Sequence, residues 1–428
     1  MKHLIIGSGP AGIFAAETIR MRDPEASVIM VTEEKQPGHS PVMLTYWMAG
    51  NRSQDSLFFR DPSWSEKKGV DVRPNSKVVS IDTSSKIIRL SEGREMEFDR
   101  LLIATGASPI SLPIQGKESK GVASLRHQRD AEIILKGGRD LREIVIMGGG
   151  FIGLKLACHL KEQGLRIMVF EKEPKLAARI FDSKASRLVE KKLQEGGIRV
   201  ETDVEVVEIL NERGWVSGVR MKDGRAFSCQ RVIETVGVRP NTEFLIGSGI
   251  DLQGGVPVNE RMETNVPGIY AAGDVAMTRD SISTEWVSNA IWPAASRQGR
   301  VAGWNMAGGH QAYLHNVNLN AIHLFGLHVM AAGHSDDNQN EAGIEVFTRE
   351  ERESYRKIVI REGQLIGFLL VGDVSGAGFL LSLMKRKGPM SYLPSDLLNN
   401  RIAMRDVLLP QLGYQHGLLF RSANEMID

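Results

Sequence analysis

Two glycine-rich turns are the parts of this sequence best suited to hold a ligand. The first reads Gly7-Ser8-Gly9-Pro10-Ala11-Gly12 and the second reads Gly148-Gly149-Gly150-Phe151-Ile152-Gly153. In each turn, the first glycine permits a sharp bend, the second lets the backbone approach a pyrophosphate, and the third lets a helix pack closely on a strand. The chemistry predicted at both turns is therefore the binding of a dinucleotide at the start of a helix.

An acidic residue follows each turn at the distance expected for a nucleotide site. Glu33 and Glu171 each come at the end of the next predicted strand, where a carboxylate can accept hydrogen bonds from an adenosine ribose. Glu171 would also repel the additional phosphate of NADP, so it favours NAD at the second turn. The cations Lys172, Lys175 and Arg179 lie close by in the sequence and leave that preference open.

The residues around each turn predict the strand, helix and strand that must position it. The first unit has an apolar strand at 2–6, a helical pattern at 13–22 and a second strand at 28–31. The second unit repeats this order with a strand at 143–147, a helix that ends at Gln163 and a strand at 166–170. Two complete units imply two dinucleotides. The alternative, that one unit is a decayed duplicate, is disfavoured because both keep three glycines and the acid.

Length, charge and patterning exclude several classes of protein. A chain of 428 residues predicts two or three domains, and a formal charge of +1 argues against nucleic acid as the main partner. The first strand begins at Lys2, which leaves no room for a signal peptide. No segment has the roughly 18 uncharged apolar residues of a membrane span, so a cytoplasmic protein is expected.

The two cysteines, Cys158 and Cys229, lie far apart and belong to no CxxC motif. This spacing excludes a disulfide framework and an internal iron-sulfur cluster. Cys158 falls on the inner face of a predicted helix, where a free cysteine packs as a small apolar residue.

Three further stretches, 102–107, 234–241 and 264–274, contain the pairs Thr105-Gly106 and Gly273-Asp274. Together with the two turns, and in this order, they make residues 1 to about 310 resemble the pyridine nucleotide-disulfide oxidoreductases. The resemblance implies FAD at the first turn and NAD(H) at the second. The residues implied for FAD are Gly7, Gly9, Pro10, Ala11, Gly12, Glu33, Thr105, Gly106 and Asp274, and those for NAD(H) are Gly148, Gly150, Ile152, Gly153 and Glu171.

The resemblance implies an α/β fold with two Rossmann-like dinucleotide-binding domains and a C-terminal α+β interface domain. The FAD domain is expected at 1–112 and 241–318, the NAD(H) domain at 113–240 and the interface domain at 319–428. A helix at 292–303 is expected to close over the flavin. The last domain, with strands at 356–361 and 364–371 and a helix at 377–385, would suit a homodimer or a foreign partner equally.

The sequence departs from the family at two positions beside the expected flavin. Disulfide reductases carry a redox-active cysteine in the segment that here reads 38–47, but Met43 has only a thioether, so disulfide reduction is not expected. His39 in this segment is a candidate catalytic residue, or a structural histidine. Lys155 replaces a glutamate common in relatives. Its ammonium would stabilise negative charge on the reduced flavin, or extend into solvent.

A flavin without a second redox centre suits exchange between NAD(H) and a one-electron carrier. We therefore expect an FAD-dependent NADH:acceptor oxidoreductase with an iron-sulfur partner. In this respect the chain resembles ferredoxin and rubredoxin reductases, and FAD subunits of anaerobic aldehyde or 2-oxoacid oxidoreductase complexes. The alternatives are a stand-alone NADH oxidase acting on oxygen and a non-enzymatic binding module that responds to nucleotides. The run Lys385-Arg386-Lys387-Gly388 would dock an acidic carrier, or simply cap a helix.

Overall fold

The computed structural model describes residues 1–136, 140–314, 317–336, 343–386, 390 and 392–399. The chain forms two compact units. The first comprises residues 1–176 and 193–318, and the second comprises residues 177–192 and the described part of 319–428.

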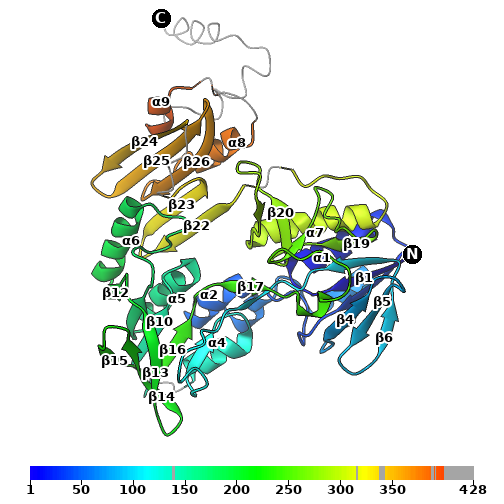
Figure 1. Cartoon of the computed structure of the whole chain (residues 1–428), viewed down its shortest axis with the longest axis horizontal. Coiled ribbons are helices and arrows are strands. Elements are labelled where there is room, and N and C mark those ends of the chain that lie inside the picture. The colour runs from blue at the N-terminus through cyan, green and yellow to red at the C-terminus, as the bar shows by residue number, and fades with distance from the viewer. Residues whose placement is uncertain (137–139, 315–316, 337–342, 387–389, 391, 400–428) are drawn as a thin grey trace, which may run out of the picture. The chain divides into compact units, whose positions relative to one another are not determined.

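A five-stranded parallel sheet organises the N-terminal part of the first unit (Figure 1). Its strands, in spatial order, are β19 (Ile269–Ala271), β7 (Arg100–Ile103), β1 (Lys2–Ile6), β2 (Ser27–Val31) and β3 (Asp71–Arg73). Helix α1 (Pro10–Arg22) joins β1 to β2 and begins three residues earlier than the sequence pattern predicts. Residues 3–6 of β1 are all buried, as expected of a parallel strand that is covered on both faces.

A second parallel sheet in the same unit repeats this plan. Its order is β12 (Arg199–Glu201), β11 (Arg166–Phe170), β10 (Glu143–Met147), β16 (Arg231–Glu234) and β9 (Val122–Ser124), and α5 (Phe151–Glu162) joins β10 to β11. The predicted α/β fold with two strand-helix-strand units is therefore confirmed. The two sheets differ in where one edge strand lies in the chain. In the second sheet the edge strand β9 comes before β10, whereas in the first sheet the edge strand β19 comes after all the other strands.

A three-stranded antiparallel sheet is inserted at the same point of each repeat, between β3 and β7 in the first parallel sheet and between β12 and β16 in the second. These are β4 (Val78–Asp82), β5 (Ile87–Leu90) and β6 (Glu95–Glu97), and β13 (Val206–Glu212), β14 (Trp215–Met221) and β15 (Ala226–Ser228). Shorter elements of the first unit are η1 (Pro41–Met43), α2 (Leu44–Met48), η2 (Gln54–Leu57), α3 (Trp64–Lys68), β8 (Ala107–Pro109), α4 (Gln128–Leu135), β17 (Val238–Pro240), η4 (Glu243–Leu245), β18 (Val256–Pro257), β20 (Ala276–Arg279) and β21 (Trp286–Val287).

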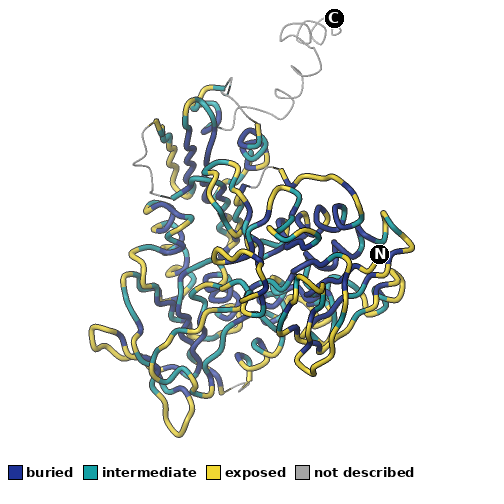
Figure 2. Tube along the Cα trace, turned by 45° about the vertical axis from the view of Figure 1, so that its right-hand side comes forward, coloured by how far each residue is buried: buried dark blue, intermediate teal, exposed yellow. Residues whose placement is uncertain are grey.

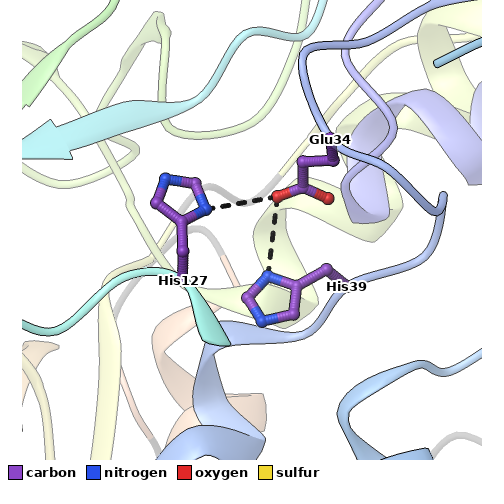
Figure 3. Close-up of side chains that lie close together, drawn as sticks. All are labelled: Glu34, His39 and His127. Carbon is purple, nitrogen blue, oxygen red and sulfur yellow. Dashed lines mark ion pairs between the residues drawn. The ribbon is translucent and has the colours of Figure 1, made fainter. Parts of the chain in front are cut away.

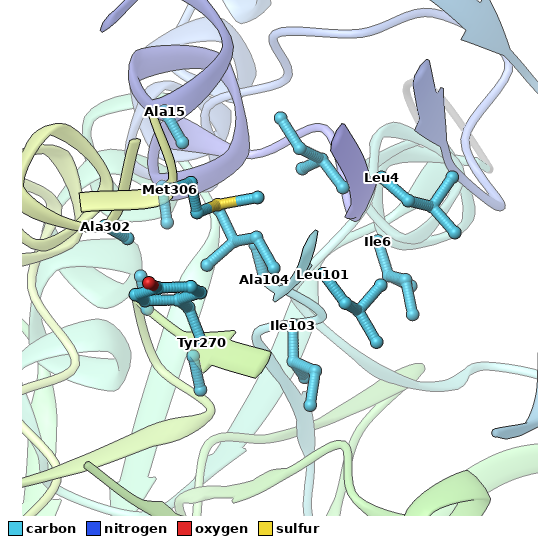
Figure 4. Close-up of a cluster of buried hydrophobic side chains, with 14 of the residues drawn as sticks. Leu4, Ile6, Ala15, Leu101, Ile103, Ala104, Tyr270, Ala302 and Met306 are labelled. Carbon is cyan, nitrogen blue, oxygen red and sulfur yellow. The ribbon is translucent and has the colours of Figure 1, made fainter. Parts of the chain in front are cut away.

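The core around the first sheet is built from neighbouring strands and the two helices α1 and α7 (Trp292–Met306). Leu4, Ile103 and Tyr270 come from β1, β7 and β19, and each is almost fully buried (Figure 4). Met306, at the end of α7, belongs to the same cluster. Buried residues run along central strands such as β1 and β26 (Gln364–Val371) and along the helices α1 and α7, whereas exposed residues are common in the connecting turns (Figure 2).

Helix α7 packs directly on α1 through glycines. A Cβ atom on Gly299 would lie 2.2 Å from the carbonyl oxygen of Ala11, and one on Gly303 would lie 2.5 Å from that of Ala15. Both distances are shorter than any van der Waals contact, so only glycine permits this approach. The predicted helix at 292–303 is therefore present, extends to Met306, and lies against the helix of the first turn.

The second unit is centred on an antiparallel sheet in the order β22 (Leu319–Leu324), β23 (Leu327–Gly333), β26 (Gln364–Val371), β25 (Ser354–Arg361) and β24 (Ile344–Glu351). It also contains α8 (Ala377–Met384), α9 (Pro394–Leu398) and most of α6 (Ser183–Glu195). The residues Lys387 and Gly388 of the basic run lie outside the described residues. No helix in the described part of the chain is both long and apolar enough to span a bilayer.

A buried ionic group explains why residues 177–192 belong to this second unit. Lys357 on β25 is 1% exposed, and its Nζ lies 3.3 Å from Asp182 Oδ2. Asp182 Oδ2 also accepts a hydrogen bond of 2.7 Å from the Tyr355 hydroxyl, and Lys357 donates to the carbonyl oxygens of Ser335 and Asp336. A charge removed from water requires such partners, so the chain just before α6 is tied to this sheet.

The contact between α1 and α7 predicts a specific loss of stability. Gly299→Ala should lower the free energy of unfolding by about 1–3 kcal/mol, because the new methyl group overlaps a carbonyl oxygen that cannot move freely. Gly378→Ala on α8 is the helical control, since nothing lies within 4 Å of its Cβ position, and it should be neutral or slightly stabilising. Urea denaturation measures both, and equal effects of the two variants would contradict the packing argument.

Candidate functional site

The first glycine turn leaves a cradle at the start of α1. Gly7 has a φ of +109°, and a Cβ there would lie 2.2 Å from the Ala104 carbonyl oxygen. A Cβ on Gly12 would lie 2.0 Å from the oxygen of Gly7, whereas nothing lies within 4 Å of the Cβ position of Gly9. Gly9 is the N-cap of α1 and provides no side chain for its first amides. The open space at Gly9 therefore fits a phosphate group.

The second turn has the same distribution of tight and open positions. Gly148 has a φ of +107° with its Cβ position 2.6 Å from the Thr235 oxygen, and that of Gly153 is 2.3 Å from the Gly148 oxygen. Nothing lies within 4 Å of the Cβ position of Gly150, which is the N-cap of α5. The next residue but one, Ile152, is half exposed beside this opening.

The two acids differ in how the protein holds them. Glu33 is exposed, has Lys77 Nζ at 3.9 Å, and lies two residues beyond the end of β2 rather than at the last strand position. Glu171 directly follows β11, and its two carboxylate oxygens accept hydrogen bonds from the backbone amides of Gly149 (2.5 Å) and Glu173 (2.8 Å). The Glu171 carboxylate is thereby fixed against the second glycine turn.

Thr105 and Gly106 lie where the chain passes between the two parallel sheets. Thr105 Oγ1 donates to the Asn241 carbonyl oxygen, and the Asn241 amide Nδ2 donates to the Thr105 carbonyl oxygen, both at 2.9 Å. The backbone amide of Asn241 donates to Gly106, and β8 pairs with β17 beside it. The two segments in which the chain passes between the sheets, at Thr105-Gly106 and at Asn241, are therefore hydrogen-bonded to each other. Asn241 ends one of the motif stretches, but the sequence alone gave it no role.

Asp274 follows Gly273, whose amide donates a 2.8 Å hydrogen bond to Gln298 Oε1. Gln298 is fully buried on α7, so the helix that packs on α1 also positions this turn. Arg126 Nη2 lies 3.3 Å from Asp274 Oδ2. The sequence contains no motif around Arg126, and only the structure brings the two residues together.

His39 has two neighbours, Glu34 and His127, that the sequence did not indicate. Glu34 Oε1 lies 3.6 Å from Nδ1 of His39 and 3.5 Å from Nδ1 of His127, so the carboxylate stands between two imidazoles (Figure 3). Burial alone would raise the pKa of Glu34, but the two histidines outweigh it and lower that pKa to about 2. Glu33, Glu34, His39 and His127 all line one hollow of about 1390 Å³.

Lys155 meets the segment in which relatives place their redox cysteine. Its Nζ lies 4.8 Å from the ring centroid of Tyr46 on α2, and the rings of Tyr46 and His159 are 5.1 Å apart. A cation over an aromatic face is attracted to the ring. The structure therefore places Lys155 against the 38–47 segment.

Neither cysteine is suited to redox chemistry. Cys158 and Cys229 are both buried, and this burial raises the pKa of each thiol to about 12. Because the thiolate is the nucleophile, both are inert near neutral pH. The predicted packing role of Cys158 agrees with its burial on α5.

Comparison with known proteins gives two family matches. A family described as pyridine nucleotide-disulphide oxidoreductase matches residues 1–299, and one described as the rubredoxin NAD+ reductase C-terminal domain matches residues 319–388. The junction between the two matches agrees with the change from the first compact unit to the C-terminal sheet.

Individual relatives differ in length. The chain is 29% identical over 415 residues to the NADH-dependent phenylglyoxylate dehydrogenase subunit epsilon of Aromatoleum evansii, which covers 96% of this chain and 97% of the relative. It is 29% identical over 390 residues to a nitrite reductase [NAD(P)H] of Bacillus subtilis, covering 91% of this chain but 48% of the relative. The chain thus spans about half the length of that enzyme.

Among solved structures, a NAD-dependent persulfide reductase from A. fulgidus is similar over 96% of this chain and 84% of that one. The TM-score is 0.86 and the sequence identity is 26%.

Proposed function

The chain belongs to the pyridine nucleotide-disulphide oxidoreductase family, and from this premise we propose that it uses FAD to move electrons between NAD(H) and a one-electron iron-sulfur carrier. We further propose that it does so as the electron-transfer subunit of a larger complex. The observation that carries this proposal is the combination of two open glycine turns with the lack of any reactive thiol.

The first turn fits the diphosphate of FAD. Gly9 leaves the space that a phosphate needs, and Pro10 and Ala11 begin the helix whose amides would face it. In the proposed site, Gly7 and Gly12 keep the turn closed, Glu33 binds the ribose, and Thr105, Gly106 and Asp274 lie along the flavin side. When bound, FAD accepts a hydride from the nicotinamide and can release its electrons one at a time.

The second turn is assigned to NAD(H). Gly150 provides the open position, Gly148 and Gly153 the tight ones, and half-exposed Ile152 an apolar contact for the dinucleotide. Glu171 already accepts hydrogen bonds from two backbone amides, so its carboxylate stays beside the turn. Its negative charge supports a preference for NADH over NADPH.

The proposed route takes the electrons to a centre on another protein, because the chain supplies no thiol to receive them. The relative that matches along nearly its whole length is named as a subunit of an NADH-dependent dehydrogenase, which supports a role within a complex. The match of the C-terminal sheet to a rubredoxin reductase domain supports an iron-sulfur partner.

Lys155 is proposed to stabilise negative charge on the reduced flavin. The Tyr46 ring holds its ammonium at the junction of α2 and α5, where a fixed cation acts without further reorganisation. His39 lies in the proposed active-site segment. It is only 6% exposed and its Nδ1 lies 3.6 Å from Glu34 Oε1, so it is a buried residue rather than a solvent-exposed base.

The two turns can be tested with a matched pair of variants. Gly9→Ala and Gly150→Ala each add a methyl group where the protein has no atom within 4 Å, so losses arise from the bound dinucleotide. The first should lower FAD occupancy, and the second should leave FAD bound but raise KM for NADH by about tenfold, or about 1.4 kcal/mol. Flavin absorbance and steady-state kinetics measure these effects. Loss of FAD in Gly150→Ala together with a raised KM for NADH in Gly9→Ala would contradict the assignment of FAD to the first turn and NADH to the second.

The acceptor is tested by turnover with NADH under two conditions. A small iron-sulfur protein such as rubredoxin or a ferredoxin, without oxygen, should be reduced at least about tenfold faster than oxygen is consumed by NADH alone. Faster oxygen consumption would instead support the NADH oxidase. Flavin that NADH does not reduce at all would support the nucleotide-responsive binding module.

Removing the Glu171 carboxylate should change the choice of nucleotide. Glu171→Ala is expected to lower the ratio of kcat/KM for NADH over NADPH by about tenfold, because repulsion of the second phosphate is lost. Glu173→Ala is the control, since it removes an exposed carboxylate two residues away. An unchanged ratio of kcat/KM for NADH over NADPH in Glu171→Ala would show that Glu171 does not contact the nucleotide.

Lys155→Gln should make the two-electron potential of the flavin more negative by about 30 mV, which corresponds to about 1.4 kcal/mol. The matched control is Lys120→Gln, because Lys120 also lies over an aromatic ring, 5.7 Å from the centroid of Trp215. Potentiometric titration of the bound flavin gives both values. Equal potentials in wild type and Lys155→Gln would show that the cation does not act on the flavin.

A further inference from the structure

The cluster of Glu34, His39 and His127 has the spacing of metal ligands rather than of hydrogen-bonded side chains. Glu34 Oε1 lies 3.6 Å and 3.5 Å from the two Nδ1 atoms, beyond the usual range of about 2.7–3.2 Å for an N–H···O hydrogen bond. A tetrahedral ion bound at about 2.0–2.1 Å keeps its ligand atoms about 3.4 Å apart. All three ligand atoms lie within 4.8 Å of one another, so one ion between them needs only a small inward movement (Figure 3).

Two atoms of this cluster lack the partners that burial normally demands. His39 is only 6% exposed, and its Nε2 is buried without a hydrogen-bond partner in the described part of the chain. The second carboxylate oxygen of Glu34, Oε2, is also buried and unpartnered there. Leaving buried polar groups unpaired is energetically costly, so such groups point to a bound ion or molecule. An ion bound by Oε1 and the two Nδ1 atoms would also lie within reach of Glu34 Oε2, whereas His39 Nε2 would carry the imidazole proton and needs a separate acceptor.

The ligand types indicate which ion would fit. Two imidazoles and one carboxylate suit zinc and similar divalent transition metals, whereas magnesium and calcium prefer oxygen ligands. The three side chains line the hollow of about 1390 Å³, which gives an ion a route from solvent. Three protein ligands also leave a coordination position for water or for a molecule in the hollow.

We propose that Glu34, His39 and His127 form a binding site for a divalent transition-metal ion, with zinc as its first candidate. The ligands come from the loop after β2 and from the N-cap of α4, so an ion would join two segments about 90 residues apart in the sequence. The site uses none of the residues assigned to the two dinucleotides. Glu33, which is assigned to the FAD ribose, lines the same hollow, so zinc binding and FAD occupancy must be measured separately.

The test is zinc titration of the FAD-containing protein after removal of metal with a chelator. Calorimetry should give one zinc ion per chain, and cobalt substituted for zinc should show the absorption of a low-symmetry site. His127→Ala and Glu34→Gln should each weaken zinc binding by about 100-fold. His310→Ala, at an exposed histidine outside the cluster, should bind zinc as the unaltered protein does.

His127→Cys separates the loss of a ligand from the loss of the fold. A thiolate at this position also binds zinc, so this variant should retain binding and add a sulfur-to-cobalt charge-transfer band. The proposal is overturned if the unaltered protein binds no stoichiometric zinc. It is equally overturned if zinc affinity is the same in His127→Ala, or if His127→Cys binds cobalt without the sulfur band.

Discussion

Backbone carbonyl oxygens occupy the space where a side chain would begin at Gly7, Gly12, Gly148 and Gly153, and the rest of the structure depends on this close approach. It forces each turn to bend directly from strand to helix, so the open glycine between them stands at a helix N-terminus. The same kind of contact recurs at Gly299, where α7 lies on the carbonyl oxygen of Ala11. Glycine packing thus connects the first turn to the helix that positions Asp274.

The sequence predicted the two parallel units, their glycines and their acids, because a dinucleotide turn is specified by a few consecutive residues. It could not predict contacts between distant segments. Arg126 meets Asp274 across 148 positions, and no sequence motif indicates that Glu34 meets His127. The grouping of residues 177–192 with the C-terminal sheet depends on the buried pair of Asp182 and Lys357, which no local pattern reveals.

The residues proposed to lie beside the flavin do not support thiol chemistry. Burial holds the pKa of both cysteines near 12, and the segment that would carry a redox cysteine instead presents Tyr46 to the ammonium of Lys155. A flavin can store and release electrons, and a fixed cation can stabilise the negative charge of its reduced form, but neither can form a disulfide. The lack of a reactive thiol therefore supports the proposal that the next electron carrier is another protein.

The central claim is that the bound flavin is the single redox centre of this chain, and anaerobic titration of the FAD-containing protein with NADH tests it most directly. Complete bleaching of the flavin is expected at about two electrons per chain. About four electrons per chain would reveal a second redox group and contradict the claim. A flavin that NADH fails to bleach would contradict the assignment of the second turn to NADH.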